Sequence, residues 1–273
     1  MTIIKFGMIG GGVMGEALLS RLITEKIYQP KEVLVSEPQP QRRDFLIERY
    51  GVGVTENNRE VTVATEVIFL AIKPQVFAEV TAELAENDMA DNSGFQPMIV
   101  SILAGVPLSK LEAAFPGFPV VRVMPNTPAT VGAGMSAIAP GKHIQSHHLK
   151  LAKGIFQAVG KVVEVPESMM DAVTGLSGSG PGYVAILIEA LTDGGVYAGL
   201  PRSIASQLAL QTVLGTAKLL EETGMHPAEL KDRVTSPGGT TIAGIAKLET
   251  AGFRSALIEA VKAAYLRSQE LGK

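Results

Sequence analysis

The chain has 273 residues, of which 46% are hydrophobic and 19% are charged, and its mean hydropathy is +0.24. This length is enough for one large or two modest domains with a sizeable buried core. The net charge of −3 provides no basic field for nucleic acid or an anionic membrane, and the absence of cysteine excludes disulfides, thiolate catalysis and Cys-ligated metals.

The first residues, MTIIKFGMIGGG, predict a strand and not a signal peptide, because Lys5 and the glycines interrupt the apolar run. No apolar stretch approaches the ~18 residues that a membrane-spanning helix needs. We therefore expect a cytoplasmic protein without nucleic-acid or membrane partners.

Short apolar runs alternate with helical patterns up to about residue 165. The predicted strands are 3–9, 33–35, 67–71, 99–102 and 120–124, with 135–139 and 161–165 extending the sheet. The predicted helices between them are 14–24, 41–50, 75–86, 108–115 and 146–159. Nearly continuous apolar strands separated by helices indicate a parallel sheet that is covered on both faces.

Strand patterns end near Pro166, and the remaining sequence has helical spacing. The predicted helices are 183–197, 203–223, 227–234, 240–249 and 254–270. The expected fold is α/β, with an N-terminal Rossmann-type doubly wound parallel sheet in residues 1–165 and a C-terminal all-α dimerisation domain in residues 166–273. Long apolar helices have little to pack on in a domain of about 100 residues, which favours a helix-mediated dimer.

Residues 10–15 form a G-x-G-x-x-G pattern that follows the first strand and opens the first helix. Gly10 permits the tight turn, Gly12 lets a pyrophosphate approach the backbone, and Gly15 lets the helix pack near the strand. The helix N-terminus adds free N–H groups for phosphates. We predict a dinucleotide site, against the alternative of a glycine-rich turn without a ligand.

The end of the second strand contains features of both nicotinamide cofactors. An acidic residue such as Glu37 usually binds the 2′-hydroxyl of NAD, whereas Ser36 with Arg42 and Arg43 suits the 2′-phosphate of NADP. We favour NADP(H) and keep NAD(H) open. Solvated charges at a helix start are the alternative.

Four further segments strengthen this interpretation, and with the glycine loop they span the chain. They are Ala71-Ile72-Lys73-Pro74, Met124-Pro125-Asn126-Thr127-Pro128, DAVTGLSGSGPGY at 171–183 and LKDRVTSPGGTTIAG at 230–244. Together they resemble the pyrroline-5-carboxylate reductases. The chain departs from that family at Glu37 and at Gly182, where alanine is usual.

The resemblance implies NAD(P)H-dependent reduction of 1-pyrroline-5-carboxylate to proline, by a homodimer that could assemble into a ring of dimers. The implied cofactor residues are Ile9, Gly10, Gly11, Gly12, Val13, Met14, Gly15, Ser36, Asn58, Ala71, Lys73, Pro74, Ala104 and Asn126. The implied substrate residues are Glu167, at the rim of the site, Ser177, Gly238, Gly239, Thr240 and Thr241. Thr241 has the catalytic position, hydrogen-bonded to the imine nitrogen.

Physical reasoning alone leaves the segment Ser236–Thr241 open between two interpretations. A proline and two glycines before a helix expose backbone N–H groups that can bind a small carboxylate. An ordinary helix start with Ser236 or Thr240 as N-cap is the alternative. The resemblance favours the first interpretation, a helix start that binds a carboxylate.

Two other functions compete with imine reduction. A reductase that resembles the β-hydroxyacid dehydrogenases would contain a Lys-x-x-x-Asn pair as its proton donor. The second region lacks such a pair. A non-catalytic protein would bind NADPH without oxidising it. His143, His147 and His148 are clustered, but the segment 141–146 is predicted to be a surface loop, and we expect no metal site.

Overall fold

The structure, a computed structural model, describes residues 3–85 and 96–272. It divides into two compact units, Met1–Gly178 with Ala264–Lys273, and Ser179–Ala263. The second unit is shorter than the predicted all-helical domain 166–273, because the segment before Ser179 and the end of the chain pack with the sheet. Glu86, the predicted end of one helix, lies outside the described residues.

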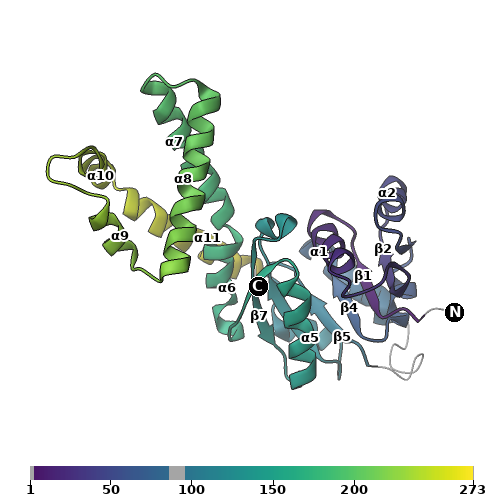
Figure 1. Cartoon of the computed structure of the whole chain (residues 1–273). Coiled ribbons are helices and arrows are strands. Elements are labelled where there is room, and N and C mark those ends of the chain that lie inside the picture. The colour runs from purple at the N-terminus through teal and green to yellow at the C-terminus, as the bar shows by residue number, and fades with distance from the viewer. Residues whose placement is uncertain (1–2, 86–95, 273) are drawn as a thin grey trace. The chain divides into compact units, whose positions relative to one another are not determined.

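The first unit is built on an eight-stranded sheet of order β3-β2-β1-β4-β5-β6-β7-β8 (Figure 1). Its strands are β1 (Phe6–Ile9), β2 (Val33–Ser36), β3 (Gly53–Thr55), β4 (Val67–Leu70), β5 (Met98–Ser101), β6 (Val120–Met124), β7 (Gly134–Pro140) and β8 (Gly160–Glu164). All neighbouring pairs are parallel except β6 and β7. The Rossmann-type sheet is confirmed. Strand β1 lies between β2 and β4, and successive strands are added on one side of β1 up to β3 and on its other side from β4 onward.

The helices of this unit lie close to the predicted positions, with one exception. They are α1 (Val13–Thr24), α2 (Pro40–Tyr50), α3 (Phe77–Ala85), α4 (Leu108–Ala114), α5 (Ser146–Gln157) and the short α6 (Met170–Val173), which the sequence did not predict. Short 3₁₀ turns, among them η2 (Asn58–Val63), η3 (Pro74–Val76), η4 (Thr127–Val131) and η5 (Glu167–Met169), complete the connections.

Alternate residues of the same strand supply two separate hydrophobic cores, one on each face of the sheet. In β4, Val67 and Phe69 belong to one core, whereas Ile68 and Leu70 belong to the other. The first core is closed by side chains of α1, α2 and α5, and the second by side chains of α3, α4 and α6. Because successive side chains of a strand point to opposite faces, a strand that is apolar throughout requires a layer of helices on each side.

The second unit consists of helices. They are α7 (Gly180–Tyr197), α8 (Arg202–Thr223), α9 (Pro227–Arg233), α10 (Thr240–Thr250) and the first part of α11 (Phe253–Gly272). The close approach of α7 to α8 depends on Gly195, where a Cβ would lie 2.9 Å from the Ala205 Cβ. The Tyr183 hydroxyl donates to the Ala260 carbonyl oxygen at 3.3 Å and so ties α7 to α11.

Tyr28 closes the first core beside Phe6, with ring centroids 5.1 Å apart. Tyr28 is 3% exposed, and its hydroxyl donates to the Glu66 carboxylate at 3.2 Å. Burial, together with the charge of Glu66, raises the pKa of Tyr28 far above its ordinary value. The folded chain therefore keeps the phenol proton at a pH where the unfolded chain, with a Tyr pKa of about 10, releases it.

A raised pKa in the folded state stabilises the fold below the unfolded pKa, and this stabilisation is lost as the pH rises. We predict that Tyr28 makes the free energy of unfolding fall by up to about 1.4 kcal/mol per pH unit above about pH 10. Tyr28→Phe should flatten this part of the decline in urea unfolding measured from about pH 8 to about pH 11. Tyr197→Phe, at a side chain that is 96% exposed, is the control. Equal slopes for Tyr28→Phe and the unchanged chain would contradict the assignment.

Candidate active site

The glycine loop between β1 and α1 has the geometry that its spacing predicts. Gly10 has a φ of +99°, and a Cβ there would lie 2.7 Å from the Ala71 carbonyl oxygen. A Cβ on Gly15 would lie 2.5 Å from the Gly10 carbonyl oxygen. A Cβ on Gly12 would meet nothing within 4 Å. The loop is thus closed on the protein side and open at Gly12, as the approach of a pyrophosphate requires.

Helix α1 begins at this opening without a side-chain cap. The first N–H groups of any helix lack an intrahelical partner. Here the N-cap residue is Gly12, which has no side chain to accept from them. Val13 is 75% exposed, whereas Ile9 is 1% exposed and Met14 packs against the first core. The loop can therefore bind a phosphate through backbone N–H groups and the positive end of the helix.

Two of the predicted cofactor residues contact each other beside the end of β2. The Ser36 hydroxyl donates to the Asn58 amide oxygen at 2.7 Å, and the Asn58 amide donates to the Glu83 carboxylate at 2.7 Å. Ser36 is 1% exposed. The hydroxyl proton of Ser36 is therefore already in use, which the sequence did not reveal.

Glu37 turns its carboxylate toward the glycine loop. One oxygen accepts from the Gly11 amide at 3.0 Å, and the other accepts from the Gln39 amide at 3.1 Å. The residue is 7% exposed. This contact joins the carboxyl ends of β1 and β2, which are neighbours in the sheet.

Arg42 lies over the same loop. Its Nε donates to the Gly11 carbonyl oxygen at 2.6 Å, and its Nη2 forms an ion pair with Glu16. Glu16 also accepts from the Tyr50 hydroxyl at 2.7 Å. Burial alone would raise the pKa of Glu16, but the hydrogen bonds from Arg42 and Tyr50 outweigh it and lower that pKa. The carboxylate of Glu16 therefore stays ionised and holds Arg42 in place.

Four predicted residues lie just beyond the carboxyl ends of β4 and β5. Ala71 directly follows β4, and its amide donates to the Ile9 carbonyl oxygen at 2.9 Å. Lys73 is the exposed N-cap residue of η3, which starts at Pro74, and Ala104 is half-buried in the loop after β5. Since β1, β4 and β5 are adjacent, these residues lie together at the carboxyl ends of the strands, where open α/β sheets bind ligands.

Asn126, just after β6, connects this edge to Ser177. Its amide group donates to the Ser177 carbonyl oxygen at 3.2 Å, and its oxygen accepts from the Met135 amide at 2.8 Å. Ser177 lies in a π-helical turn, Thr174–Gly178, a distortion that is frequent at functional sites. The structure thus brings a predicted cofactor residue and a predicted substrate residue into contact.

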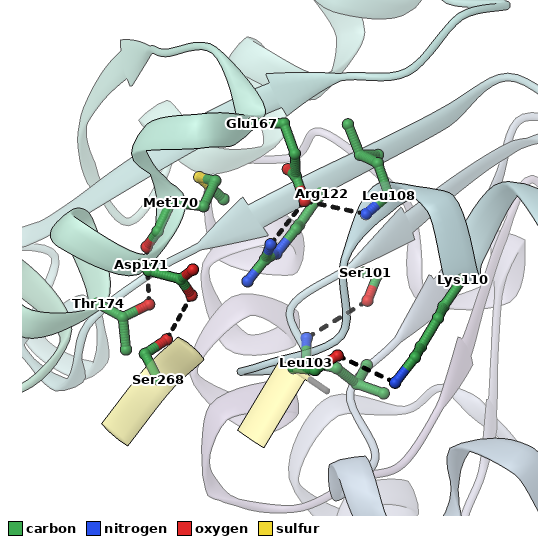
Figure 2. A network of polar contacts seen from close by, with 11 residues as sticks. Ser101, Leu103, Leu108, Lys110, Arg122, Glu167, Met170, Asp171, Thr174 and Ser268 are labelled. Atoms are coloured by element: carbon green, nitrogen blue, oxygen red, sulfur yellow. Dashed lines mark hydrogen bonds and ion pairs between the residues drawn. The ribbon is translucent and has the colours of Figure 1, made fainter. Parts of the chain in front are cut away.

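Glu167 has partners within the first unit, shown in Figure 2. One carboxylate oxygen accepts from Arg122 Nη1 at 2.7 Å and from the Leu108 amide, at the start of α4, at 3.0 Å. Arg122 is 4% exposed, and the second oxygen of Glu167 is buried without a partner among the described residues. These contacts hold η5 against β6 and α4. A role for Glu167 toward the substrate stays a prediction.

The end of α11 packs in the same region. The Ser268 hydroxyl donates to the Asp171 carboxylate at 2.7 Å, and Lys110 Nζ donates to the Gly272 carbonyl oxygen at 3.0 Å (Figure 2). A cavity of about 530 Å³ lies between these contacts and the Arg122–Glu167 pair. The sequence analysis missed Arg122, because a single arginine inside an apolar strand carries no recognisable pattern.

The segment Ser236–Thr241 in the second unit ends at an uncapped helix. Gly238 has a φ of +69°, and Gly239 is the N-cap residue of α10 without a side-chain hydrogen bond. The Gly239 amide donates to the Ser236 carbonyl oxygen at 3.0 Å, whereas Thr240 and Thr241 are exposed. The alternative of an ordinary start capped by Ser236 or Thr240 is therefore wrong. The amides of Thr240 and Thr241 have no acceptor within the helix and can bind an anion.

The histidine segment shows no ligand geometry. The rings of His147 and His148 are 3.8 Å apart, and His148 Nδ1 accepts from the Gln145 amide at 3.2 Å. Burial, followed by the charge of His147, lowers the pKa of His148. Across residues 3–85 and 96–272, no three His, Cys, Asp or Glu side chains are grouped as metal ligands would be. In the same ranges, no helix has the length and apolar character needed to cross a bilayer.

Comparison with known proteins identifies relatives along the whole chain. Residues 167–271 match the family described as pyrroline-5-carboxylate reductase dimerisation, and residues 5–105 match NADP oxidoreductase coenzyme F420-dependent. The pyrroline-5-carboxylate reductase of Synechocystis is 61% identical, with 99% of each chain covered.

Solved structures agree with this. A pyrroline-5-carboxylate reductase from Coxiella burnetii superposes with a TM-score of 0.89 at 34% identity, covering 100% of each chain. The Plasmodium falciparum pyrroline carboxylate reductase with NADP bound gives 0.88 at 31% identity, also covering 100% of each chain.

The glycine loop allows a matched pair of variants to separate folding from ligand binding. Gly12→Ala adds a methyl group in open space, so we predict an unchanged free energy of unfolding but a loss of the stabilisation by NADPH, about 2.7 kcal/mol at 100 times Kd. Gly15→Ala pushes a methyl group against the Gly10 carbonyl oxygen and should itself destabilise the chain by roughly 1–3 kcal/mol.

Thermal unfolding with and without NADPH measures both effects. If Gly12→Ala keeps its full shift in Tm with NADPH, then the phosphates do not approach the chain at Gly12.

Proposed function

The chain belongs to the pyrroline-5-carboxylate reductase family, and we propose that it reduces the C=N bond of 1-pyrroline-5-carboxylate to give proline with NADPH as the preferred reductant. The observation that carries the proposal is the uncapped start of α10, whose free amides fit a small carboxylate. The open glycine loop supplies the matching phosphate site for the cofactor.

The bound cofactor supplies the hydride for the imine carbon. The chain's own residues bind and orient the substrate. The amides of Thr240 and Thr241 would hold the substrate carboxylate, as helix N-termini hold anions. The Thr241 hydroxyl would hydrogen-bond the ring nitrogen and fix the face of the imine that receives the hydride.

This chemistry does not require a strong acid on the protein. A cyclic imine can arrive already protonated on nitrogen, and protonation makes the adjacent carbon electrophilic. The hydride and this proton together account for the two hydrogens gained across the C=N bond. The protein's contribution is then positioning and exclusion of water, while the cofactor supplies the chemistry.

The positions of the remaining predicted residues support a site of this kind. Asn126 and Ser177 are in direct contact, and Ala71, Lys73, Pro74 and Ala104 border the same edge of the sheet as the glycine loop. Ser36 and Asn58 lie beside the expected adenosine end. We keep all of them as proposed cofactor or substrate residues.

We also propose that the chain forms a homodimer through residues of the helical domain, with a ring of dimers as the larger assembly. Ile204, Leu208, Leu210, Leu214 and Leu219 of α8 are each at least 43% exposed, and only Ala205 and Ala209 of this helix are buried. Large apolar side chains that stay exposed along one helix favour burial against a partner. The match of residues 167–271 to a dimerisation family supports the same assembly.

Thr241→Ala tests the mechanism. We predict that it lowers kcat/KM for the imine roughly 10- to 100-fold, equivalent to about 1.4–2.8 kcal/mol of transition-state stabilisation, while the Kd for NADPH changes little. Thr241→Ser should restore part of the activity, because it keeps the hydroxyl. Thr250→Ala, at the other end of α10, is the control and should behave like the unchanged chain. Full turnover by Thr241→Ala would remove Thr241 from the mechanism.

The assembly is tested by mass measurement in solution. We predict a mass of at least twice the 28.7 kDa of one chain, and a shift toward the monomer for Leu214→Asp, because the charge would be buried at the interface. Ile47→Asp, at a similarly exposed position on α2, should leave the mass unchanged. A monomeric mass for the unchanged chain at micromolar concentration would contradict the proposed dimer.

A further inference from the structure

The adenosine end of the cofactor site contains two arginines, and both are already neutralised. Arg42 pairs with Glu16 and lies with its guanidinium carbon 4.8 Å from the centre of the Phe45 ring. Arg43 Nη2 pairs with Glu56 at 3.2 Å. Neither guanidinium therefore offers an unopposed positive charge to a 2′-phosphate.

Other donors at the same place are also in use. Arg43 Nη1 donates to the carbonyl oxygens of Glu37 and Pro38, at 2.9 and 3.0 Å. The buried Ser36 hydroxyl donates to Asn58. The three residues that indicated NADP in the sequence are thus engaged with the protein, and a 2′-phosphate would have to displace existing partners.

The carboxylate of Glu37 is in the opposite situation. Among the described residues, no lysine or arginine pairs with it, and both of its hydrogen bonds come from neutral backbone amides, those of Gly11 and Gln39. Each carboxylate oxygen can accept a further hydrogen bond, because a carboxylate offers about four lone-pair sites. A ribose 2′-hydroxyl can use such a site, whereas a 2′-phosphate would meet a like charge.

The charges around the ribose end consequently favour neither cofactor strongly. Three carboxylates, of Glu16, Glu37 and Glu56, face the guanidinium groups of Arg42 and Arg43, and the charge of Arg49 also acts on Glu16. Of these three carboxylates, Glu37 has no ion pair in the described part of the chain, and because it is 7% exposed its charge is screened only weakly by solvent. A 2′-phosphate bound close to this carboxylate would therefore meet a weakly screened like charge.

We propose that Glu37 determines the cofactor selectivity of this chain, by accepting from a ribose 2′-hydroxyl and repelling a 2′-phosphate. Because of Glu37, the chain can also use NADH, and its preference for NADPH over NADH is smaller than it would be without this carboxylate. The inference rests on the proposed function for the identity of the cofactor, but its test does not depend on turnover.

The test is calorimetric binding of 2′,5′-ADP and of ADP to the full chain, because these two nucleotides differ in the 2′-phosphate and carry no nicotinamide. We expect the unchanged chain to bind them with affinities within about tenfold of each other. Glu37→Gln should shift the ratio toward 2′,5′-ADP by roughly tenfold, since it removes the charge and keeps an oxygen near the Gly11 amide. Glu37→Asp, which keeps the charge, should leave the ratio near its original value.

Glu48→Gln is the matched control, because Glu48 is an exposed carboxylate on the same helix as Arg42. Glu37→Ser provides the same loss of charge with a small side chain, so selectivity is still measured if glutamine packs badly beside Gly11. An unchanged ratio in whichever neutral variant folds, or a preference above about 100-fold for 2′,5′-ADP in the unchanged chain, would overturn the proposal.

Steady-state oxidation of NADPH and NADH with 1-pyrroline-5-carboxylate then tests the proposed imine reduction separately from the role of Glu37. The same shift should appear in KM for the two cofactors while kcat stays constant. Absence of any oxidation would contradict the proposed function, while the binding ratio would still decide the role of Glu37.

Discussion

The nucleotide end of the sheet depends on how closely three backbone segments approach one another. The Cα of Gly15 faces the Gly10 carbonyl, and the Cα of Gly10 faces the Ala71 carbonyl at the end of β4. Neither approach leaves room for a side-chain carbon. This contact sets the start of α1 against the sheet, and with it the direction of the helix N–H groups toward the opening at Gly12. The position of the phosphate site is therefore a packing property of the backbone, which side chains only support.

Much of the fold follows from the sequence, because strands buried on both faces leave an apolar run that is hard to mistake. Strand β6 has the predicted bounds, and most other elements of the sheet end within a few residues of theirs. Strand β3 was missed because Gly53–Thr55 is only three residues long and lies at the edge of the sheet. Three residues are too few to show a recognisable strand pattern. The antiparallel pairing of β7 with β6 also escaped prediction, because periodicity reports burial and not strand direction.

The site was predictable where the argument needed only local backbone geometry. The roles of Gly10, Gly12 and Gly15 belong to this class. It was not predictable where partners come from distant segments. Arg42 meets Glu16, and Ser36 meets Asn58, across separations of 26 and 22 residues. Composition shows which charges are available but not which are already paired, and cofactor selectivity depends on the pairing.

The two proposed anion sites share one device, a helix that starts at glycine and lacks a side-chain cap, at Gly12 in α1 and at Gly239 in α10. Backbone amides do not titrate and carry only partial charge, so they bind a phosphate or carboxylate without placing a full cation beside it. A site of this kind discriminates weakly between anions, because every oxyanion offers suitable acceptors. Discrimination must then come from the few full charges nearby. Of the carboxylates of Glu16, Glu37 and Glu56, Glu37 has no ion pair with a described residue, and for this reason a single carboxylate can control the choice between two nearly identical cofactors.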